Sequence, residues 1–192
     1  KMNNPKIPVI LASQSPRRIE LLKTVIENFR VVPSKIDEIC DTDLSPEENA
    51  ILLGRKKATS VAKLHPHHLV IGADTLVVLE NKIIGKPTDT ENARQILRQL
   101  SGQEHKVITG VAVVHSKIFS AASISRVRIK TLTSNEINSY VKSEEPMDKA
   151  GAYAIQGKGS FLVESYDGPY SNIVGLPINL LKNLLQKLNL SI

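Results

Sequence analysis

The sequence predicts an α/β protein built on a mixed twisted sheet with flanking helices, and three observations support this fold class. First, short apolar runs typical of buried strands alternate with capped, amphipathic segments typical of helices. Second, a chain of 192 residues with 41% hydrophobic and 23% charged residues has an ordinary globular composition, which excludes a disordered protein. Third, no linker or internal repeat divides the chain. We therefore expect one domain over residues 1–192.

In the first half of the chain, three apolar runs predict strands and two Ser-Pro dipeptides predict helix starts. Serine caps the unpaired N–H groups of a helix, and the fixed φ angle of proline suits its first turn. The expected strands are residues 7–12, 29–33 and 69–79, and the expected helices begin at Ser15-Pro16 and at Ser45-Pro46.

The second half is expected to alternate in the same way. Leucines between Leu176 and Leu188 recur on one stripe, which predicts an amphipathic terminal helix. A glycine-rich stretch runs from Gly151 to Gly159, and its run Gly157-Lys158-Gly159 is expected to be a loop. The other expected elements are strands over residues 107–114, 124–132 and 161–164, a helix from residue 89 or 90 to residue 100, and a helix over residues 134–141.

Charge and composition restrict the partners. The formal net charge of +6 favours anionic ligands. Aromatic residues are only 4% of the chain, which is poor material for stacking single-stranded nucleic acid. A single cysteine, Cys40, forms no internal disulfide, and no apolar run reaches the length of about 20 residues that a spanning helix needs. We expect a cytoplasmic protein that binds neither nucleic acid nor a membrane.

The segment Ser13-Gln14-Ser15-Pro16-Arg17-Arg18 follows a predicted strand and opens a predicted helix. Anions bind well at such a junction, because the first N–H groups of the helix are unpaired and its dipole is positive there. Two adjacent arginines add bidentate donors that suit phosphate oxygens. The segment predicts a phosphate-binding site, and a capped helix with solvated arginines is the alternative that the residues leave open.

Asp74 is a carboxylate inside an otherwise apolar strand, where burial is costly unless a cation, a metal or hydrogen-bond donors meet it. Lys57 lies on the apolar stripe of its helix, and it either extends to solvent or serves a buried anion. Glu38 lies in an acidic loop and is either solvated or a partner of Asp74 in binding Mg²⁺ or Mn²⁺. For Asp74 itself, the alternative is a structural aspartate bonded to nearby backbone.

With these residues in view, the sequence resembles the Maf family of nucleoside triphosphate pyrophosphatases over nearly the whole chain. Neither common nucleotide-binding glycine motif is present, so the resemblance depends on several motifs in order. The form D-K-A-G-A-Y-x-I-Q-G is similar to the branch that prefers dTTP and UTP. The matching segments are LASQSPRR (11–18), IGADTLVV (71–78), GKP (85–87), LSGQEHKVITGVAV (100–113), EPMDKAGAYAIQGKGS (145–160) and VGLPI (174–178).

The resemblance implies two lobes around a deep cleft, a shape related to the inosine triphosphate pyrophosphatases, and a homodimer. It implies hydrolysis of a nucleoside triphosphate to the monophosphate and pyrophosphate, with Mg²⁺ or Mn²⁺ as cofactor and with water attacking the α-phosphorus. By position, Asp74 is the catalytic acceptor of a water proton. The metal is expected on Glu38 and Asp74, and the sequence does not tell which of the two is its main ligand. Arg17, Thr75 and Gln156 fall on positions of substrate selection, and Ser13, Arg18, Glu38, Lys57 and Lys86 fall on other pocket positions.

Two other hypotheses remain open at the level of sequence. A basic nucleic-acid-binding or septation-regulating module without catalysis predicts DNA binding that falls steeply with salt. Hydrolysis at the γ-phosphorus instead predicts release of orthophosphate. The scarcity of aromatic residues and the position of Asp74 favour the pyrophosphatase. Whether its substrate is a canonical pyrimidine nucleotide or one with a modified base is not encoded in any of these motifs.

Overall fold

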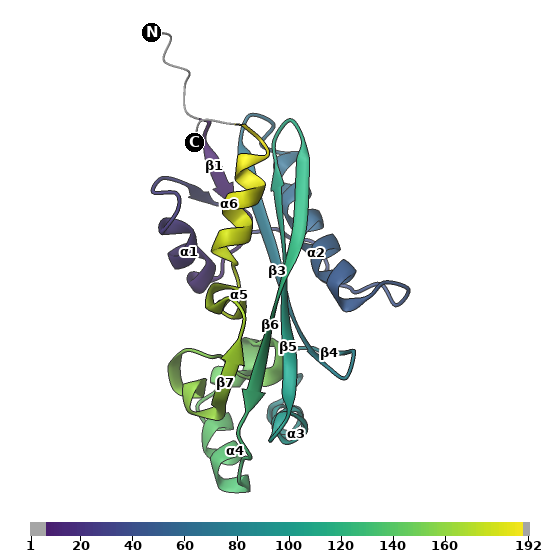
Figure 1. Cartoon of the computed structure of the whole chain (residues 1–192), viewed down its shortest axis with the longest axis vertical. Coiled ribbons are helices and arrows are strands. Elements are labelled where there is room, and N and C mark those ends of the chain that lie inside the picture. The colour runs from purple at the N-terminus through teal and green to yellow at the C-terminus, as the bar shows by residue number, and fades with distance from the viewer. Residues whose placement is uncertain (1–6, 190–192) are drawn as a thin grey trace. The chain divides into compact units, whose positions relative to one another are not determined.

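The computed structural model describes residues 7–189 and has a mixed sheet with helices packed on it (Figure 1). The strand order is β2-β1-β3-β5-β6-β7, and β4 pairs with β3. The chain divides into two compact units. The first unit takes in residues up to Asp74, Thr109–Ser123 and the chain from Gly175, and the second takes in Thr75–Ile108 and Ile124–Val174. The α/β class and the mixed sheet with flanking helices are confirmed, and the single domain stays a prediction.

The first unit contains the predicted strand–helix junctions. The Ser15 side chain accepts a hydrogen bond from the Arg18 N–H, and Ser45 forms a reciprocal capping box with Glu48, so both Ser-Pro helix starts are confirmed. Strand β1 pairs in parallel with both β2 and β3. The elements are β1 (Val9–Leu11), α1 (Pro16–Lys23), β2 (Arg30–Val31), α2 (Pro46–Ala62), α6 (Ile178–Gln186) and parts of β3 (Leu69–Leu79), β5 (Glu104–Val114) and β6 (Ile118–Ile129).

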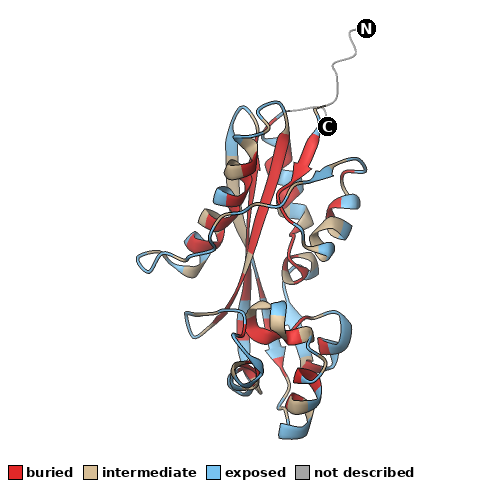
Figure 2. Cartoon of the chain, turned by 180° about the vertical axis from the view of Figure 1, so that it is seen from behind, coloured by how far each residue is buried: buried red, intermediate tan, exposed pale blue. Residues whose placement is uncertain are grey.

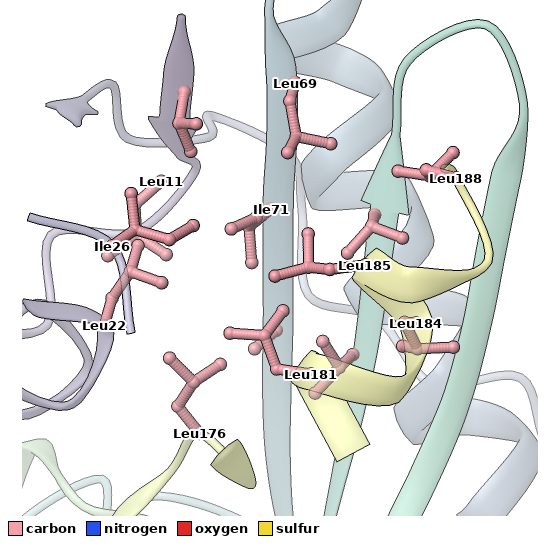
Figure 3. Packing of buried hydrophobic residues seen from close by; sticks show 14 residues of the cluster. Leu11, Leu22, Ile26, Leu69, Ile71, Leu176, Leu181, Leu184, Leu185 and Leu188 are labelled. Atoms are coloured by element: carbon pink, nitrogen blue, oxygen red, sulfur yellow. The ribbon is translucent and has the colours of Figure 1, made fainter. Parts of the chain in front are cut away.

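Alternation along the strands divides the core of the first unit between the two faces of the sheet. Leu69 and Ile71 face one way and pack with buried leucines of α1 and α6 (Figure 3). Val70, between them, faces the other way and packs with Ala58 and Val61 of α2. Buried residues accordingly follow the strands and the inner sides of the helices (Figure 2). By this alternation Asp74 faces α2, as Val70 does.

Glycines bring α2 unusually close to the sheet. A Cβ atom on Gly72 of β3 would lie 2.5 Å from the carbonyl oxygen of Gly54, and one on Gly110 of β5 would lie 2.0 Å from that of Ala50. No larger residue fits at these two positions without moving backbone. The close approach places the inner side of α2 directly against the side chains of β3, which matters for the site described below.

The second unit has its own core and more short elements than the sequence predicts. Helices α3 and α4 pack against Val77, Val107 and Val127. The glycine-rich stretch contains short 3₁₀ helices, one of which takes in the run Gly157-Lys158-Gly159 that was expected to be a loop. Strand β4 and helix α5 are not anticipated by the hydrophobic pattern. The elements are β4 (Lys82–Ile84), α3 (Thr90–Leu100), α4 (Ser134–Val141), η1 (Glu145–Asp148), η2 (Ala150–Ala152), η3 (Gly157–Leu162), β7 (Val163–Asp167) and α5 (Tyr170–Val174).

Strand β6 begins at Ile118, six residues before its predicted start, because its neighbour β5 is a long strand of 11 residues that pairs with it beyond the apolar run. The terminal helix begins at Ile178 rather than at Leu176. Within residues 7–189, no helix is both long enough and apolar enough to cross a membrane.

Candidate active site

The first part of the site lies where β1 ends and α1 begins. The Ser13 hydroxyl is nearly buried and accepts a hydrogen bond from the Ser15 N–H at 3.2 Å. Nη1 of Arg18 lies 3.5 Å from the same hydroxyl, and Nε of Arg18 donates to the carbonyl oxygen of Gly175 at 2.7 Å. The guanidinium is therefore held from two sides in a fixed orientation beside the helix N-terminus.

Arg18 stands in the field of two carboxylates. Burial lowers the pKa of its guanidinium, while the negative charges of Asp74 and Glu38 act in the opposite direction. An arginine remains charged in a protein at neutral pH even so. Its positive charge thus lies near both acidic residues that the sequence singled out.

The second part of the site is an ion-paired triad. Nζ of Lys57 lies 2.5 Å from Oδ1 of Asp74 and 2.8 Å from Oε1 of Glu38. Asp74 is 5% exposed and Lys57 is 7% exposed, whereas the Glu38 side chain is about half exposed at 47%. For Lys57, the structure shows the contact with a buried anion rather than extension to solvent. Glu38 shares this ammonium with Asp74, and its role as a metal ligand stays a prediction.

The triad follows from the local structure of each element. Asp74 faces α2 because of the alternation of β3, and Lys57 faces β3 because it follows Leu53 and precedes Val61 on the buried side of α2. The contacts of Gly72 and Gly110 bring the two elements close enough for an ion pair. A buried carboxylate of this kind is retained only when a partner compensates its charge.

The oxygen donors of the triad fit a divalent metal in one specific way. Within the described part of the chain, no group of three or more His, Cys, Asp or Glu residues is arranged to hold a metal ion. Mg²⁺ is commonly bound through only one or two carboxylates together with substrate phosphates and water. Glu38 and Asp74, which share one cation in this structure, could together supply two such carboxylates.

The remaining predicted residues are distributed as follows. Arg17 is half-buried in α1, next to Arg18. Thr75 is the first residue of the second unit and directly follows Asp74 in β3. Lys86 and Gln156 are exposed and both belong to the second unit. The structure therefore gathers Ser13, Arg18, Glu38, Lys57 and Asp74 within the first unit.

In the second unit, the turn that carries Lys86 is joined to the glycine-rich stretch. The Gly151 N–H donates to the carbonyl oxygen of Gly85 at 3.1 Å. Gly151 has a φ of +71°, and a Cβ atom there would lie 2.9 Å from Val77. This close packing accounts for the glycine at this position.

Sequence reasoning missed two residues that organise these segments. Gly175 supplies the carbonyl that fixes Arg18, and it does so with a φ of +126° that favours glycine. Glu145 accepts hydrogen bonds from Tyr140, Lys158 and Gly159. Both residues lie in segments that match the family's motifs, and this was the only signal in the sequence. Their hydrogen-bond partners are too far away along the chain for a local sequence pattern to indicate them.

Comparison with known proteins gives concordant results. The family model described as Maf-like protein matches residues 8–188. The chain is 48% identical over 187 residues to the dTTP/UTP pyrophosphatase of Caldicellulosiruptor bescii, covering 94% of each chain, and 47% identical over 183 residues to that of Clostridioides difficile, covering 93% of this chain and 94% of the other. The Ham1 protein of Staphylococcus aureus shares the fold, with a TM-score of 0.51 and 18% identity over 94% of this chain and 98% of the other.

Proposed function

Since this chain belongs to the family of Maf-like proteins, we propose that it hydrolyses dTTP and UTP to the nucleoside monophosphate and pyrophosphate. The observation that carries the proposal is the ion-paired triad of Lys57, Asp74 and Glu38, of which Lys57 and Asp74 are buried, together with Arg18 at the start of α1, whose charge acts on both carboxylates. A nucleic-acid-binding module has no use for a carboxylate buried in a strand, whereas a hydrolase needs such a group to activate water.

Asp74 is assigned the role of the group that orients water and accepts its proton. A general base acts only if it is ionised and fixed within hydrogen-bond reach of its water. Strand β3 fixes the Asp74 backbone, and the ammonium of Lys57 contacts Oδ1 of Asp74 and thereby holds the carboxylate in place. Attack by the activated water on the α-phosphorus then expels pyrophosphate.

The triphosphate is assigned to the positively charged groups. Charge develops on the phosphoryl oxygens and on the leaving pyrophosphate, and preorganised donors stabilise it most strongly where water is excluded. Arg18, Arg17 and the start of α1 supply such donors in the first unit, and Ser13 fixes part of this arrangement. Lys86 is likewise assigned to the phosphates, because it falls on a pocket position of the family's GKP segment.

Glu38 and Asp74 are the residues that would hold Mg²⁺ or Mn²⁺. When bound, the ion would neutralise charge on the phosphoryl oxygens and polarise the phosphorus. Because the Lys57 ammonium already contacts both carboxylates, we expect metal binding to be stronger in the presence of the nucleotide, whose phosphates complete the ligand set.

Base choice is assigned to Gln156, together with Thr75 and Arg17. A glutamine amide can donate to a pyrimidine carbonyl and accept from the ring N–H at the same time. Gln156 is exposed, and its side chain makes no capping bond to η3. The exposed amide supports this assignment, and a loop glutamine bonded to backbone is the alternative that the nucleotide screen of a Gln156 variant separates from it.

We further propose that the chain works in the cytoplasm as a homodimer, as its resemblance to the family implies. Sedimentation of the purified protein at several concentrations tests the dimer. A single species at the monomer mass of 21.1 kDa over the whole range would contradict it.

The function is tested by incubating the protein with each canonical and several modified nucleoside triphosphates, with Mg²⁺ or Mn²⁺, and by resolving pyrophosphate from orthophosphate. We expect pyrophosphate and the monophosphate, with dTTP and UTP preferred. Orthophosphate with a diphosphate would indicate attack at the γ-phosphorus. DNA binding that falls with salt, without turnover of any nucleotide, would favour the nucleic-acid-binding alternative.

A further inference from the structure

The segment that carries Gln156 is held by one carboxylate from outside that segment. Oε1 of Glu145 accepts hydrogen bonds from the Gly159 N–H at 2.9 Å and from the Tyr140 hydroxyl at 3.0 Å. Oε2 of Glu145 accepts a hydrogen bond from the Lys158 N–H at 3.0 Å. All these residues belong to the second unit. The carboxylate thus connects α4, η1 and the start of η3.

The carboxylate of Glu145 caps helix η3, because the residue at the helix's own N-cap position makes no capping hydrogen bond. The first N–H groups of any helix have no partner inside it. Gln156 occupies the N-cap position of η3, but its side chain makes no capping hydrogen bond. Glu145 takes over that role from a distance of eleven residues in sequence, and a negative charge there is also favourable to the helix dipole. Consequently Gln156 does not have to cap its own helix.

The backbone around Gln156 is shaped to fit the carboxylate closely. Gly157 has a φ of +73°, and a Cβ atom there would lie 3.0 Å from Oε2 of Glu145. A Cβ atom on Gly159 would lie 2.6 Å from the Tyr140 hydroxyl oxygen. Glycine at both positions allows the chain to pass this close. The direction in which the chain leaves Gln156 is therefore fixed by the contact with Glu145.

The charge states of the two side chains agree with the hydrogen bonds. Burial acts to raise the pKa of Glu145, but the N–H groups of Lys158 and Gly159 outweigh it, so the pKa is lowered overall. Burial, and then the charge of Glu145, raise the pKa of Tyr140. Glu145 is an ionised acceptor and Tyr140 a protonated donor across the neutral pH range.

We propose that Glu145 is the positioning residue of Gln156 and thereby determines how sharply the enzyme distinguishes one base from another. The inference rests on the proposed role of Gln156 in base selection. Discrimination by hydrogen bonds requires donor and acceptor atoms at fixed positions, since only then does a mismatched base leave polar groups unpaired. Hydrolysis is assigned instead to Asp74, Lys57 and Glu38, which belong to the first unit, whereas Glu145 and Gln156 belong to the second.

The experiment measures kcat/KM for UTP and for CTP, two bases that differ in the groups they offer to an amide. The variants are Glu145→Gln, which keeps the shape but replaces one acceptor oxygen by a donor, and Tyr140→Phe, which removes one bond to the carboxylate. The matched control is Glu136→Gln. Glu136 accepts from the Thr133 N–H at 2.8 Å and from Nζ of Lys130 at 2.9 Å, and caps α4 in the same unit.

We expect the ratio of kcat/KM for UTP to kcat/KM for CTP to fall at least tenfold in Glu145→Gln, and by less in Tyr140→Phe. In both variants, kcat for UTP should change by less than about threefold. In Glu136→Gln the ratio should stay within twofold of the wild type, whatever the loss of thermal stability. The decisive step is a cycle with Gln156→Ala, because an effect transmitted through Gln156 must disappear in that background.

An unchanged ratio in Glu145→Gln, with a lowered Tm, would assign Glu145 to stability alone and overturn the inference. An equal fall of the ratio in the Gln156→Ala background would show that Glu145 acts by another route, which also overturns it. If Glu145→Gln does not fold, the Tyr140→Phe cycle decides in the same way. A wild-type protein that releases no pyrophosphate, or shows no preference for UTP, would instead contradict the proposed function, and the inference would fail with it.

Discussion

Replacing Lys57 by methionine removes the ammonium that contacts both carboxylates of the triad. Methionine keeps the unbranched, apolar stem that packs on the inner side of α2, so the change isolates the charge. Removing one partner of a buried ion pair costs about 3–5 kcal/mol, because the other charge stays buried without compensation. Asp74, at 5% exposed, is such a charge, whereas Glu38 is half exposed and water can solvate it.

The free energy of unfolding should therefore decrease by about 3 kcal/mol, at the lower end of that range, because the positive charge of Arg18 also acts on Asp74. For a chain of this size, each kcal/mol corresponds to about 2–4 °C, so the Tm should fall by about 6–12 °C. Urea unfolding followed by circular dichroism measures the difference. The matched control is Lys56→Met, which removes an exposed charge from the neighbouring position of the same helix.

The same variant should respond to divalent cations. Without the ammonium, Glu38 and Asp74 can both bind a metal ion. Added Mn²⁺, in the absence of nucleotide, should therefore raise the free energy of unfolding of Lys57→Met more than that of the wild type. The reasoning is refuted if the free energies of unfolding of Lys57→Met and Lys56→Met differ by less than about 0.5 kcal/mol, which is the size of an ordinary effect of a surface substitution. Equal stabilisation of both proteins by Mn²⁺ would refute the competition between ammonium and metal.

Three further predictions concern the reaction and the second unit. Asp74→Asn should lower kcat by about 10²-fold or more while binding of the nucleotide persists, and turnover within a few-fold of wild type would remove Asp74 from the mechanism. Gln156→Glu should lower dTTP and UTP hydrolysis far more than residual purine hydrolysis, since it loses the donor end of the amide; equal losses for all bases would make the residue structural. Burial lowers the pKa of His105 to about 4, so the folded state favours its neutral form, whereas the unfolded chain binds a proton at a higher pH. The free energy of unfolding should therefore decrease by about 3 kcal/mol as the pH falls from 7 to 4. Comparison of unfolding curves of wild type and His105→Phe checks this, because the variant should lose that part of the pH dependence, and parallel curves would contradict it.

The fold class and the beginnings of several helices could be predicted because their causes are local. Ser15 and Ser45 cap the helices that follow them, and both contacts span only three residues. The strand over residues 69–79 was recognisable because it is apolar and long enough to be buried. By contrast, β4 and α5 are short, and their stability comes from pairing or packing rather than from their own pattern.

The sequence by itself also determined that Asp74 needed an explanation, because a carboxylate in an apolar strand is costly wherever the chain folds. Only the tertiary structure decided what compensates it. The partner Lys57 lies 17 residues earlier, and the contact exists because Gly72 and Gly110 let α2 approach β3 and β5.

The hydrogen bonds that Glu145 accepts next to Gln156 are a second case in which the sequence indicates a contact and only the tertiary structure identifies the partner. The sequence places Gln156 inside the glycine-rich stretch, directly before Gly157, which indicates a close approach of the backbone to another group without identifying that group. The acceptor is Glu145, brought to the N–H groups of Lys158 and Gly159 by the packing of η1 against η3. Capping chemistry within three residues is encoded in the sequence itself, whereas contacts across elements depend on interhelical and helix–sheet distances that only the folded chain fixes.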